Sequence, residues 1–210
     1  MDNGFDKFLN GYQVFREKYV HADISIMNGL HDHGQKPKLM VVACCDSRVD
    51  PALLLQCDPG DLFVVRNVAN IVPPFEKDDQ HHGTSAALEF GICLLNVKHL
   101  ILLGHSQCGG VISLLKGDSM AKNDFISNWV SLIKIDHHQS YEVDDYAKIA
   151  LLKSYQDCLT FPWIKEKVEK KDLLIHLWFF DIKSGVIHAY CKKEKSFKPL
   201  DQFDWRTNLD

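Results

Sequence analysis

A histidine and a cysteine that stand three residues apart are the first pair in this sequence that could bind a metal ion. They are His105 and Cys108, in a segment with glycine at 104, 109 and 110, which lets the backbone bend tightly. Zinc accepts a mixture of imidazole and thiolate ligands in tetrahedral geometry. A third ligand has to come from elsewhere, and Cys44 and Cys45 are candidates. The alternative is a buried cysteine pair with a structural histidine.

Asp46 and Arg48 follow these two cysteines directly. They could form an ordinary solvated ion pair in a loop. Beside a metal, however, the arginine would keep the aspartate ionised and off the metal through a charge-assisted contact. The carboxylate could then accept a hydrogen bond from a metal-bound water. Because two thiolates neutralise the charge of zinc, such a nearby base would compensate for its weaker acidification of water.

Short apolar segments end directly before both groups. Residues 39–44 lead into Asp46, and residues 100–103 lead into His105. Both segments are suited to buried strands, as are residues 62–65 and 173–180. Buried strands that alternate with helices indicate a mainly parallel sheet, in which ligands collect at the carboxyl ends of the strands.

The remaining elements are read from periodicity and composition. Helical spacing of aromatic and aliphatic residues predicts an amphipathic N-terminal helix. Residues 84–96 are apolar nearly all round, which predicts a helix buried on several sides. Residues 31–38 read as a loop, and residues 186–191 as a last strand. The charged segment from Lys192 onward is expected to pack loosely. The apolar residues of the N-terminal helix are Phe5, Phe8, Leu9, Tyr12 and Phe15.

These elements predict an α/β fold. We expect a mainly parallel central β-sheet of four parallel strands plus a C-terminal antiparallel edge strand, flanked by helices and preceded by an N-terminal helical arm. A chain of 210 residues suits a single domain. We divide it into the arm 1–34, a catalytic core 35–191 and a tail 192–210.

Composition limits the partners and the compartment. The formal net charge is −4, without a basic block, so nucleic acid is not an expected partner. No apolar run reaches the roughly 18 residues that a membrane-spanning helix needs. The N-terminus lacks the apolar core of a signal peptide, so we expect a cytoplasmic protein. Seven irregularly spaced cysteines do not suggest a disulfide framework.

The two motifs together resemble a known family. Cys44-x-Asp46-Ser47-Arg48, followed by His105-x-x-Cys108-Gly109-Gly110, is similar to the two-part signature of β-class carbonic anhydrases. The similarity runs from about residue 35 to residue 185 and includes the segments 59–61, 63–70, 72–74, 159–162 and 181–185.

The resemblance implies a metal site and a reaction. The ligands of one Zn²⁺ per chain would be Cys44, His105 and Cys108, with Cys45 as a variable position. The activity would be that of a zinc lyase, the reversible hydration of CO2 to bicarbonate and a proton by attack of zinc-bound hydroxide. The other cysteines match no ligand of the family, and we expect buried or semi-buried thiols. They are Cys57, Cys93, Cys158 and Cys191.

The resemblance also implies roles around the metal. Asp46 and Arg48 would form the catalytic dyad, and the backbone N–H of Gly109 would help to orient the substrate. Gln35, Phe63 and Phe90 would complete an apolar CO2 pocket beside the zinc of a neighbouring chain. The unit would therefore be a homodimer or a larger assembly such as a tetramer. The apolar helix at 84–96 agrees with this expectation, and a charge at Leu88 should break the dimer if Leu88 faces the partner.

By its departures from the family pattern, the chain resembles the plant-like subgroup of the family. Val41 and Phe180 replace a tryptophan and a tyrosine that hold inhibitory bicarbonate in another subgroup, so Arg66 alone would not form that site. The zinc should then keep an exchangeable fourth ligand. Leu94 stands where a proton-transfer histidine is often found, which leaves the exit route of the proton open.

Three other functions remain compatible with parts of this pattern. A hydrolase of CS2 or COS would use the same metal site. A zinc-stabilised protein without activity would keep the ligands, but the presence of Asp46, Arg48 and Gln35 argues against it. A thiol redox protein would need Cys44 and Cys45 to pair, and adjacent cysteines rarely form an unstrained disulfide.

Overall fold

A six-stranded sheet forms the centre of the molecule in the computed structural model, which describes residues 4–22, 25–116, 125–134 and 142–204. The strand order is β2-β1-β3-β4-β5-β6. The first four strands are parallel, and β5 and β6 are antiparallel. The strands are β1 Leu39–Cys44, β2 Leu62–Asn67, β3 His99–His105, β4 Leu174–Asp181, β5 Val186–Cys191 and β6 Ser196–Pro199. The predicted fold class is confirmed, with one antiparallel strand more than expected.

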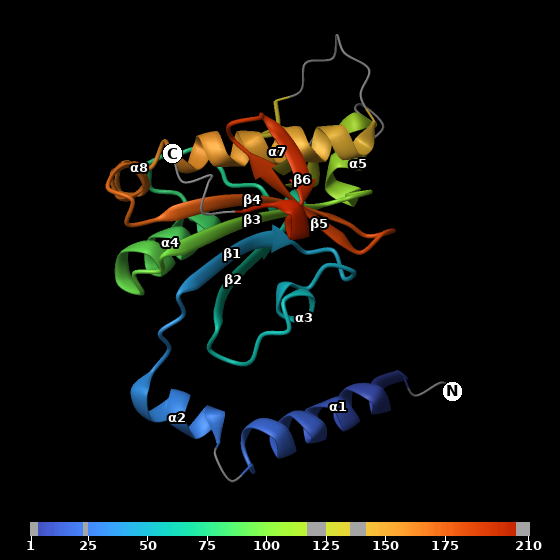
Figure 1. The fold of residues 1–210 in the computed structure, drawn as a ribbon, viewed down its shortest axis with the longest axis vertical. Helices are drawn as coiled ribbons and strands as arrows, with labels where there is room; N and C mark the ends of the chain where they lie inside the picture. The colour runs from blue at the N-terminus through green and yellow to red at the C-terminus, as the bar shows by residue number, and fades with distance from the viewer. Residues whose placement is uncertain (1–3, 23–24, 117–124, 135–141, 205–210) are drawn as a thin grey trace.

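The central strands are buried because they carry apolar side chains on both faces. In β1, residues 40 to 43 are fully buried, and in β3 Leu100 and Leu102 are equally inaccessible. Helix α7, Val143–Cys158, lies along β3 and β4 (Figure 1). A side chain at Gly104 would meet Leu151 of α7 at 3.0 Å, so the glycine allows the helix to approach the sheet closely.

Shorter helices complete the layers around the sheet. Helices α5, Gly109–Leu115, and α6, Phe125–Val130, contact each other, and α5 also contacts α7. Helix α8, Pro162–Glu169, follows α7, and helix α3, Pro51–Leu54, follows β1. Two 3-10 turns, Val68–Asn70 and Leu200–Gln202, follow β2 and β6. In the described part of the chain, no helix combines the length and the apolar character that crossing a membrane requires.

The apolar helix predicted at 84–96 is present, and in the single chain it leaves part of its apolar surface exposed. It consists of α4, Gly83–Glu89, which continues as a π-helix at Phe90–Leu94. Leu88 and Ile92 are fully buried in the chain's own core, whereas Phe90 and Leu94 are 41% and 70% exposed. The suggestion that Leu88 faces a partner is therefore wrong, and a charge there would disrupt the core of its own chain.

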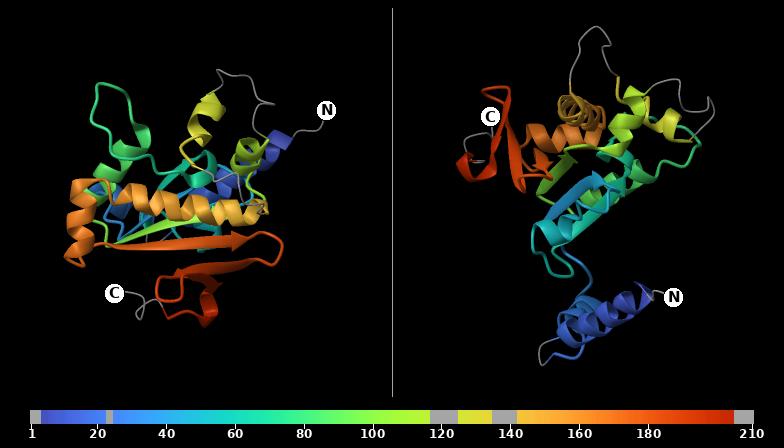
Figure 2. Two further views of the ribbon diagram at one scale, coloured as in Figure 1. Left: turned by 90° about the horizontal axis from the view of Figure 1, so that it is seen from above. Right: turned by 90° about the vertical axis from the view of Figure 1, so that its right-hand side faces the viewer.

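The N-terminal arm projects away from the sheet (Figures 1 and 2). It consists of α1, Gly4–Tyr19, and α2, Ile26–His33, so the loop expected at 31–38 begins only after His33. No residue of α1 is buried, and its Tyr19 donates a hydrogen bond of 2.7 Å to Asp58. The helix predicted from the aromatic pattern is confirmed, with its apolar side chains exposed.

The segment after Lys192 packs more closely than the sequence predicted. Residues 196–199 form β6, which pairs with β5. Phe197 contributes to this packing because its ring lies against Tyr190 with 5.1 Å between ring centroids. The expectation of a loosely packed segment is thus wrong for these residues, and the predicted tail beyond residue 204 lies outside the described part.

Candidate metal centre

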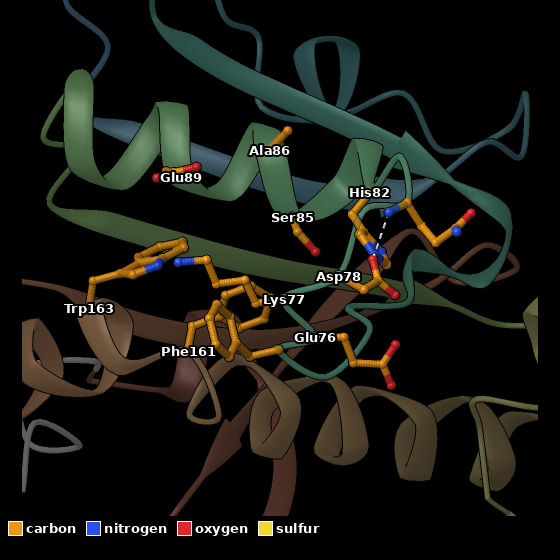
Figure 3. A pocket seen from close by; sticks show the side chains of 11 residues that line it. Glu76, Lys77, Asp78, His82, Ser85, Ala86, Glu89, Phe161 and Trp163 are labelled. Carbon is orange, nitrogen blue, oxygen red and sulfur yellow. Dashed lines mark hydrogen bonds and ion pairs between the residues drawn. The ribbon is translucent and has the colours of Figure 1, made fainter.

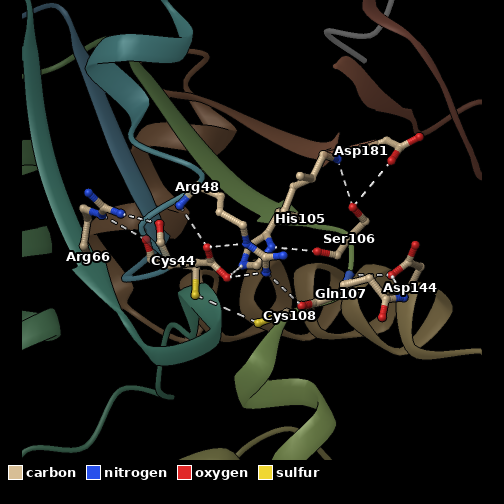
Figure 4. A network of polar contacts seen from close by, with 11 residues as sticks. Cys44, Arg48, Arg66, His105, Ser106, Gln107, Cys108, Asp144 and Asp181 are labelled. Atoms are coloured by element: carbon tan, nitrogen blue, oxygen red, sulfur yellow. Dashed lines mark hydrogen bonds and ion pairs between the residues drawn. The ribbon is translucent and has the colours of Figure 1, made fainter. Parts of the chain in front are cut away.

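Three ligand atoms converge at the carboxyl ends of β1 and β3 (Figure 4). Cys44 ends β1, His105 ends β3, and Cys108 is the residue directly before α5. One ligand atom from each lies within 4.8 Å of the others, and all three residues are buried. The two sulfur atoms are 3.9 Å apart. The parallel pairing of β1 with β3 brings the three residues together, as the sequence predicted.

The ring of His105 is oriented by the backbone of the next residue, Ser106. Its Nδ1 lies 2.9 Å from the carbonyl oxygen of Ser106, an acceptor, so Nδ1 carries the proton and Nε2 has a free lone pair. Nε2 is fully buried and has no hydrogen-bond partner among the described residues. A buried nitrogen without a partner is costly, and a metal ligand is one of the few roles that explain it.

The two sulfur atoms compete for one negative charge. The hydrogen bond from Cys108 lowers the pKa of Cys44 to about 4, and the same interaction together with burial raises the pKa of Cys108. A divalent cation between them would allow both thiols to ionise. Two thiolates and one imidazole nitrogen, with the imidazole already in the tautomer that a ligand needs, fit a zinc ion.

Asp46 lies beside this cluster and is held by Arg48. Its Oδ1 accepts hydrogen bonds from the backbone N–H and Nε of Arg48, at 3.0 and 2.9 Å, and its Oδ2 accepts one from Nη2 at 2.7 Å. These contacts hold the pKa of Asp46 well below its usual range. Oδ2 is also 3.9 Å from Nε2 of His105, so the carboxylate faces the point where the ligands converge.

Arg66 has a role that the sequence analysis missed. Its guanidinium donates to the carbonyl oxygens of Cys44 and Asp46, at 2.9 and 2.7 Å, and to the carboxylate of Asp50 at 2.7 Å. It therefore fixes the loop that carries one ligand and the aspartate. The signal in the sequence was an arginine inside the apolar strand β2, but two of its three acceptors are backbone oxygens, which no motif reveals.

Ser106 fixes the second ligand loop to β4. Its backbone N–H donates to the carbonyl oxygen of Phe180 at 2.9 Å, and its hydroxyl accepts a hydrogen bond from the backbone of Ile182, also at 2.9 Å. The hydroxyl can also donate to Asp181, at 3.5 Å. The residue is 4% exposed, so these contacts are sheltered from water and hold His105 against the end of the sheet.

The predicted substrate residues fall into three places. Gly109 begins α5 beside Cys108, with open space around its Cα. Phe63 and Phe90 stack on each other, with 5.7 Å between ring centroids. Because Asn67 is the register partner of Cys44, Phe63 lies about 13 Å back along β2 from the metal ligands. Gln35 is exposed in the segment between α2 and β1.

The remaining cysteines mostly follow their predicted burial. Cys158 is fully buried, and Cys57 and Cys191 are intermediate. Cys93 is exposed, because the π-helix turns it away from the core, so the expectation for this residue is wrong. Cys45 is exposed next to the buried ligand Cys44, since neighbouring residues of an extended segment point in opposite directions.

Away from the ligand cluster, a pocket of about 450 Å³ lies between α4, α8 and the segment before α4 (Figure 3). Its walls include Phe161, Trp163 and Glu89, and the ion pair between Asp78 and His82, 2.7 Å apart, lies at one end. None of the residues that line it belongs to the three-ligand cluster, so we do not assign it a part in the chemistry of that cluster.

Comparison with known proteins identifies the family. The sequence profile of the family described as "Carbonic anhydrase" matches residues 39–187. A carbonic anhydrase of Synechocystis sp. is 33% identical over 195 residues, which cover 88% of this chain and 70% of the relative. The chloroplastic beta carbonic anhydrase 5 of Arabidopsis thaliana is 36% identical over 191 residues, which cover 84% of this chain and 62% of the relative.

Solved structures give the same result. The β-carbonic anhydrase CcaA superposes with a TM-score of 0.82 at 31% identity, covering 93% of this chain and 91% of that one. A tetrameric β-carbonic anhydrase from the ascomycete Sordaria macrospora has a TM-score of 0.77 at 28% identity, covering 90% and 97% of the two chains. The chain described here belongs to the β-class carbonic anhydrase family.

Proposed function

We propose that the protein catalyses the reversible hydration of carbon dioxide to bicarbonate and a proton, with one zinc ion bound by Cys44, His105 and Cys108. The observation that carries this proposal is the convergence of three buried ligand atoms within 4.8 Å, directly beside a carboxylate that is held by an arginine. Family membership supports the same reaction.

Zinc in this position would acidify a water molecule and so supply a nucleophile for carbon dioxide near neutral pH. Asp46 would accept a hydrogen bond from that nucleophile and aim it at the substrate. Because Arg48 keeps the pKa of Asp46 so low, the carboxylate orients the nucleophile and is a poor acceptor for its proton. The backbone N–H of Gly109, at the start of α5, would donate to a substrate oxygen.

The fourth position of the metal would remain exchangeable. Arg48 uses both oxygens of Asp46, which keeps the carboxylate from binding the metal itself. The guanidinium of Arg66 is engaged by the loop that it fixes, so it is not available to hold an inhibitory bicarbonate. Val41 and Phe180 are buried apolar residues and would not bind bicarbonate either. These observations support an open zinc site.

A second copy of the chain would complete the substrate pocket. Phe63 and Phe90 stack away from the metal ligands of their own chain, and Phe90 is 41% exposed. We propose that these two residues and Gln35 line the pocket of a neighbouring protomer. The exposed aromatic side chains of α1 support an assembly of this kind, as does the tetrameric state of the Sordaria relative.

A matched pair of cysteine variants tests the function. The purified protein should contain one zinc per chain and hydrate carbon dioxide in a stopped-flow assay. Cys44→Ser should lose the zinc and lower the rate by about 100-fold or more, because it removes a ligand. Cys45→Ser should keep the zinc and the wild-type rate of CO2 hydration. A zinc-loaded wild-type protein that fails to hydrate CO2 but releases sulfide from CS2 or COS would refute the proposed substrate.

A further inference from the structure

The loop between the two ligands His105 and Cys108 contains a residue in an unfavourable backbone conformation. Gln107 has a φ of +52°, in the left-handed region that residues with a side chain rarely adopt. Such a conformation persists only where surrounding contacts determine it. The contacts that hold Gln107 therefore also determine the spacing of the two ligands on either side of it.

The N-terminus of α7 provides such a contact. Oδ1 of Asp144, the second residue of this helix, accepts a hydrogen bond of 2.7 Å from the backbone N–H of Gln107 (Figure 4). The side-chain amide of Gln107 donates to the same oxygen at 3.4 Å. Helix α7 is anchored along β3 and β4, so the carboxylate is presented from a rigid element.

The opposite side of the same residue contacts Arg48. The carbonyl oxygen of Gln107 accepts a hydrogen bond of 3.2 Å from Nη2 of Arg48. This nitrogen also donates to Oδ2 of Asp46 at 2.7 Å. Gln107 thus connects the carboxylate of α7 to the arginine that orients Asp46, through contacts to its own N–H and C=O groups.

We propose that Asp144 is a positioning residue for the metal centre. It holds Gln107 in its left-handed conformation, and in this way it sets both the spacing of the metal ligands and the direction of Arg48. The inference rests on the proposed function for its effect on turnover, but its effect on metal affinity follows from the ligand geometry alone.

The neighbouring Asp145 provides a matched control. It also lies in the first turn of α7, where a negative charge interacts favourably with the helix dipole. Its carboxylate pairs instead with Lys148, at 3.8 Å. Removal of either carboxylate should therefore weaken the helix to a similar extent. A decrease in zinc affinity that occurs only when Asp144 is replaced then reports the contact with Gln107.

The test compares Asp144→Ala, Asp144→Asn and Asp145→Ala in the zinc-loaded protein. The zinc dissociation constant is measured by competition with a chelator, and kcat and KM for CO2 are measured at saturating zinc. Asp144→Ala should weaken zinc binding by about 10- to 100-fold, as the loss of a supporting contact does at other metal sites. It should also lower kcat about tenfold with little change in KM.

The conservative variant Asp144→Asn keeps an acceptor oxygen and should recover most of the affinity and of kcat. Asp145→Ala should match the wild type in both. Equal zinc dissociation constants for Asp144→Ala and Asp145→Ala would overturn the inference, and so would a failure of Asp144→Asn to bind zinc better than Asp144→Ala. A wild type that lacks CO2 hydration would refute the proposed function and leave the comparison of zinc affinities intact.

Discussion

Arg48 contacts Asp46 through its backbone N–H, its Nε and its Nη2, so the carboxylate has little freedom to turn. The same contacts lower the pKa of Asp46. A strongly ionised carboxylate accepts hydrogen bonds well but takes up protons poorly. In the proposed reaction the released proton would therefore have to leave by another route, and Leu94 has no titratable group that could carry it.

Substitution of Arg48 tests this assignment. Arg48→Ala should free Asp46 to coordinate zinc and lower kcat by about 100-fold, because the fourth position of the metal is then blocked. Arg48→Lys keeps the charge but cannot form the two parallel contacts, and its loss should be smaller. X-ray absorption of the zinc-loaded Arg48→Ala protein should show an additional oxygen ligand. A wild-type site that already has Asp46 bound to zinc would contradict this account.

Sequence alone indicated the candidate metal ligands and the aspartate–arginine pair, but not the residues that support them. The paired motifs, read against the family, selected Cys44 over Cys45, and the structure buries the first and exposes the second. Arg66 and Asp144 could not be found in this way. The contacts by which they hold the site include backbone atoms of other segments of the chain, and only the packing of β1 and α7 brings those atoms within reach.

At the scale of elements, α5 must approach the turn after β2 very closely. A side chain at Gly110 would meet Cγ1 of Val68 at 2.7 Å and Cβ of Ala69 at 3.0 Å. Cys108 stands two residues before this contact. The fit between α5 and the 3-10 turn therefore also determines the position of one metal ligand.

A pair of glycine variants measures this fit. Gly110→Ala should lower the free energy of unfolding by about 1–3 kcal/mol, because the added methyl group forces α5 away from Val68. A Cβ added at Gly109 would have no atom within 4 Å, so Gly109→Ala should be neutral or slightly stabilising. Denaturant unfolding of the two variants provides the comparison. If the two variants had equal free energies of unfolding, the 3-10 turn would have moved to accommodate the methyl group at no cost in stability.

A partly buried histidine pair should make the sheet sensitive to acid. His99 Nδ1 and His176 Nε2 are 3.0 Å apart between β3 and β4. Burial, together with the charges of His99 and Lys192, lowers the pKa of His176 to about 4 from the ordinary value of 6.5. Between these two pH values the unfolded chain binds a proton that the folded chain excludes. The free energy of unfolding should therefore fall by up to about 3 kcal/mol as the pH decreases through this window.

The variant His176→Phe keeps an aromatic ring against His99 and removes this titration. Its stability should be less dependent on pH between 6.5 and 4 than that of the wild type. The exposed residue His33 serves as a control, because His33→Gln should leave the dependence unchanged. The explanation would be wrong if thermal unfolding showed the same pH dependence for His176→Phe and the wild type.

The first five strands were predictable because each is a short, mainly apolar run between polar loops, as at residues 39–44 and 186–191. Strand β6 was missed, since residues 196–199 follow a charged segment and form a short edge strand without a continuous apolar pattern. For the helix predicted at 84–96, composition could not tell which apolar residues face the core of their own chain. Leu88 does so, and Leu94 does not.

At the scale of the whole molecule, α1 exposes a row of large apolar side chains. Phe5 and Phe8 are 70% and 69% exposed, and Tyr12 is 58% exposed. Exposure of this kind on a helix that projects from the body is typical of a surface that another chain covers. This observation supports an assembly in which the arm of one protomer lies on its partner.

Charged substitutions on this face test the assembly. The double variant Phe8→Asp and Leu9→Asp should weaken association, because two carboxylates would have to be buried in an apolar interface. Asn10→Asp adds a charge on the opposite side of the same helix and should have no effect. Light scattering and CO2 hydration are measured on the same samples. A wild-type protein that is monomeric and fully active at the assay concentration would exclude the assembly.

The two sulfur ligands are separated by 64 residues. They meet only after β1 and β3 have paired in parallel, and pairing between distant segments forms slowly in folding. We therefore expect the ligand set to be completed late in folding, after most of the native surface is already buried. A metal that binds such a set slows unfolding and has little influence on the rate of folding. Zinc would therefore control how long the folded enzyme lasts, while the pairing of the central strands controls how fast it forms.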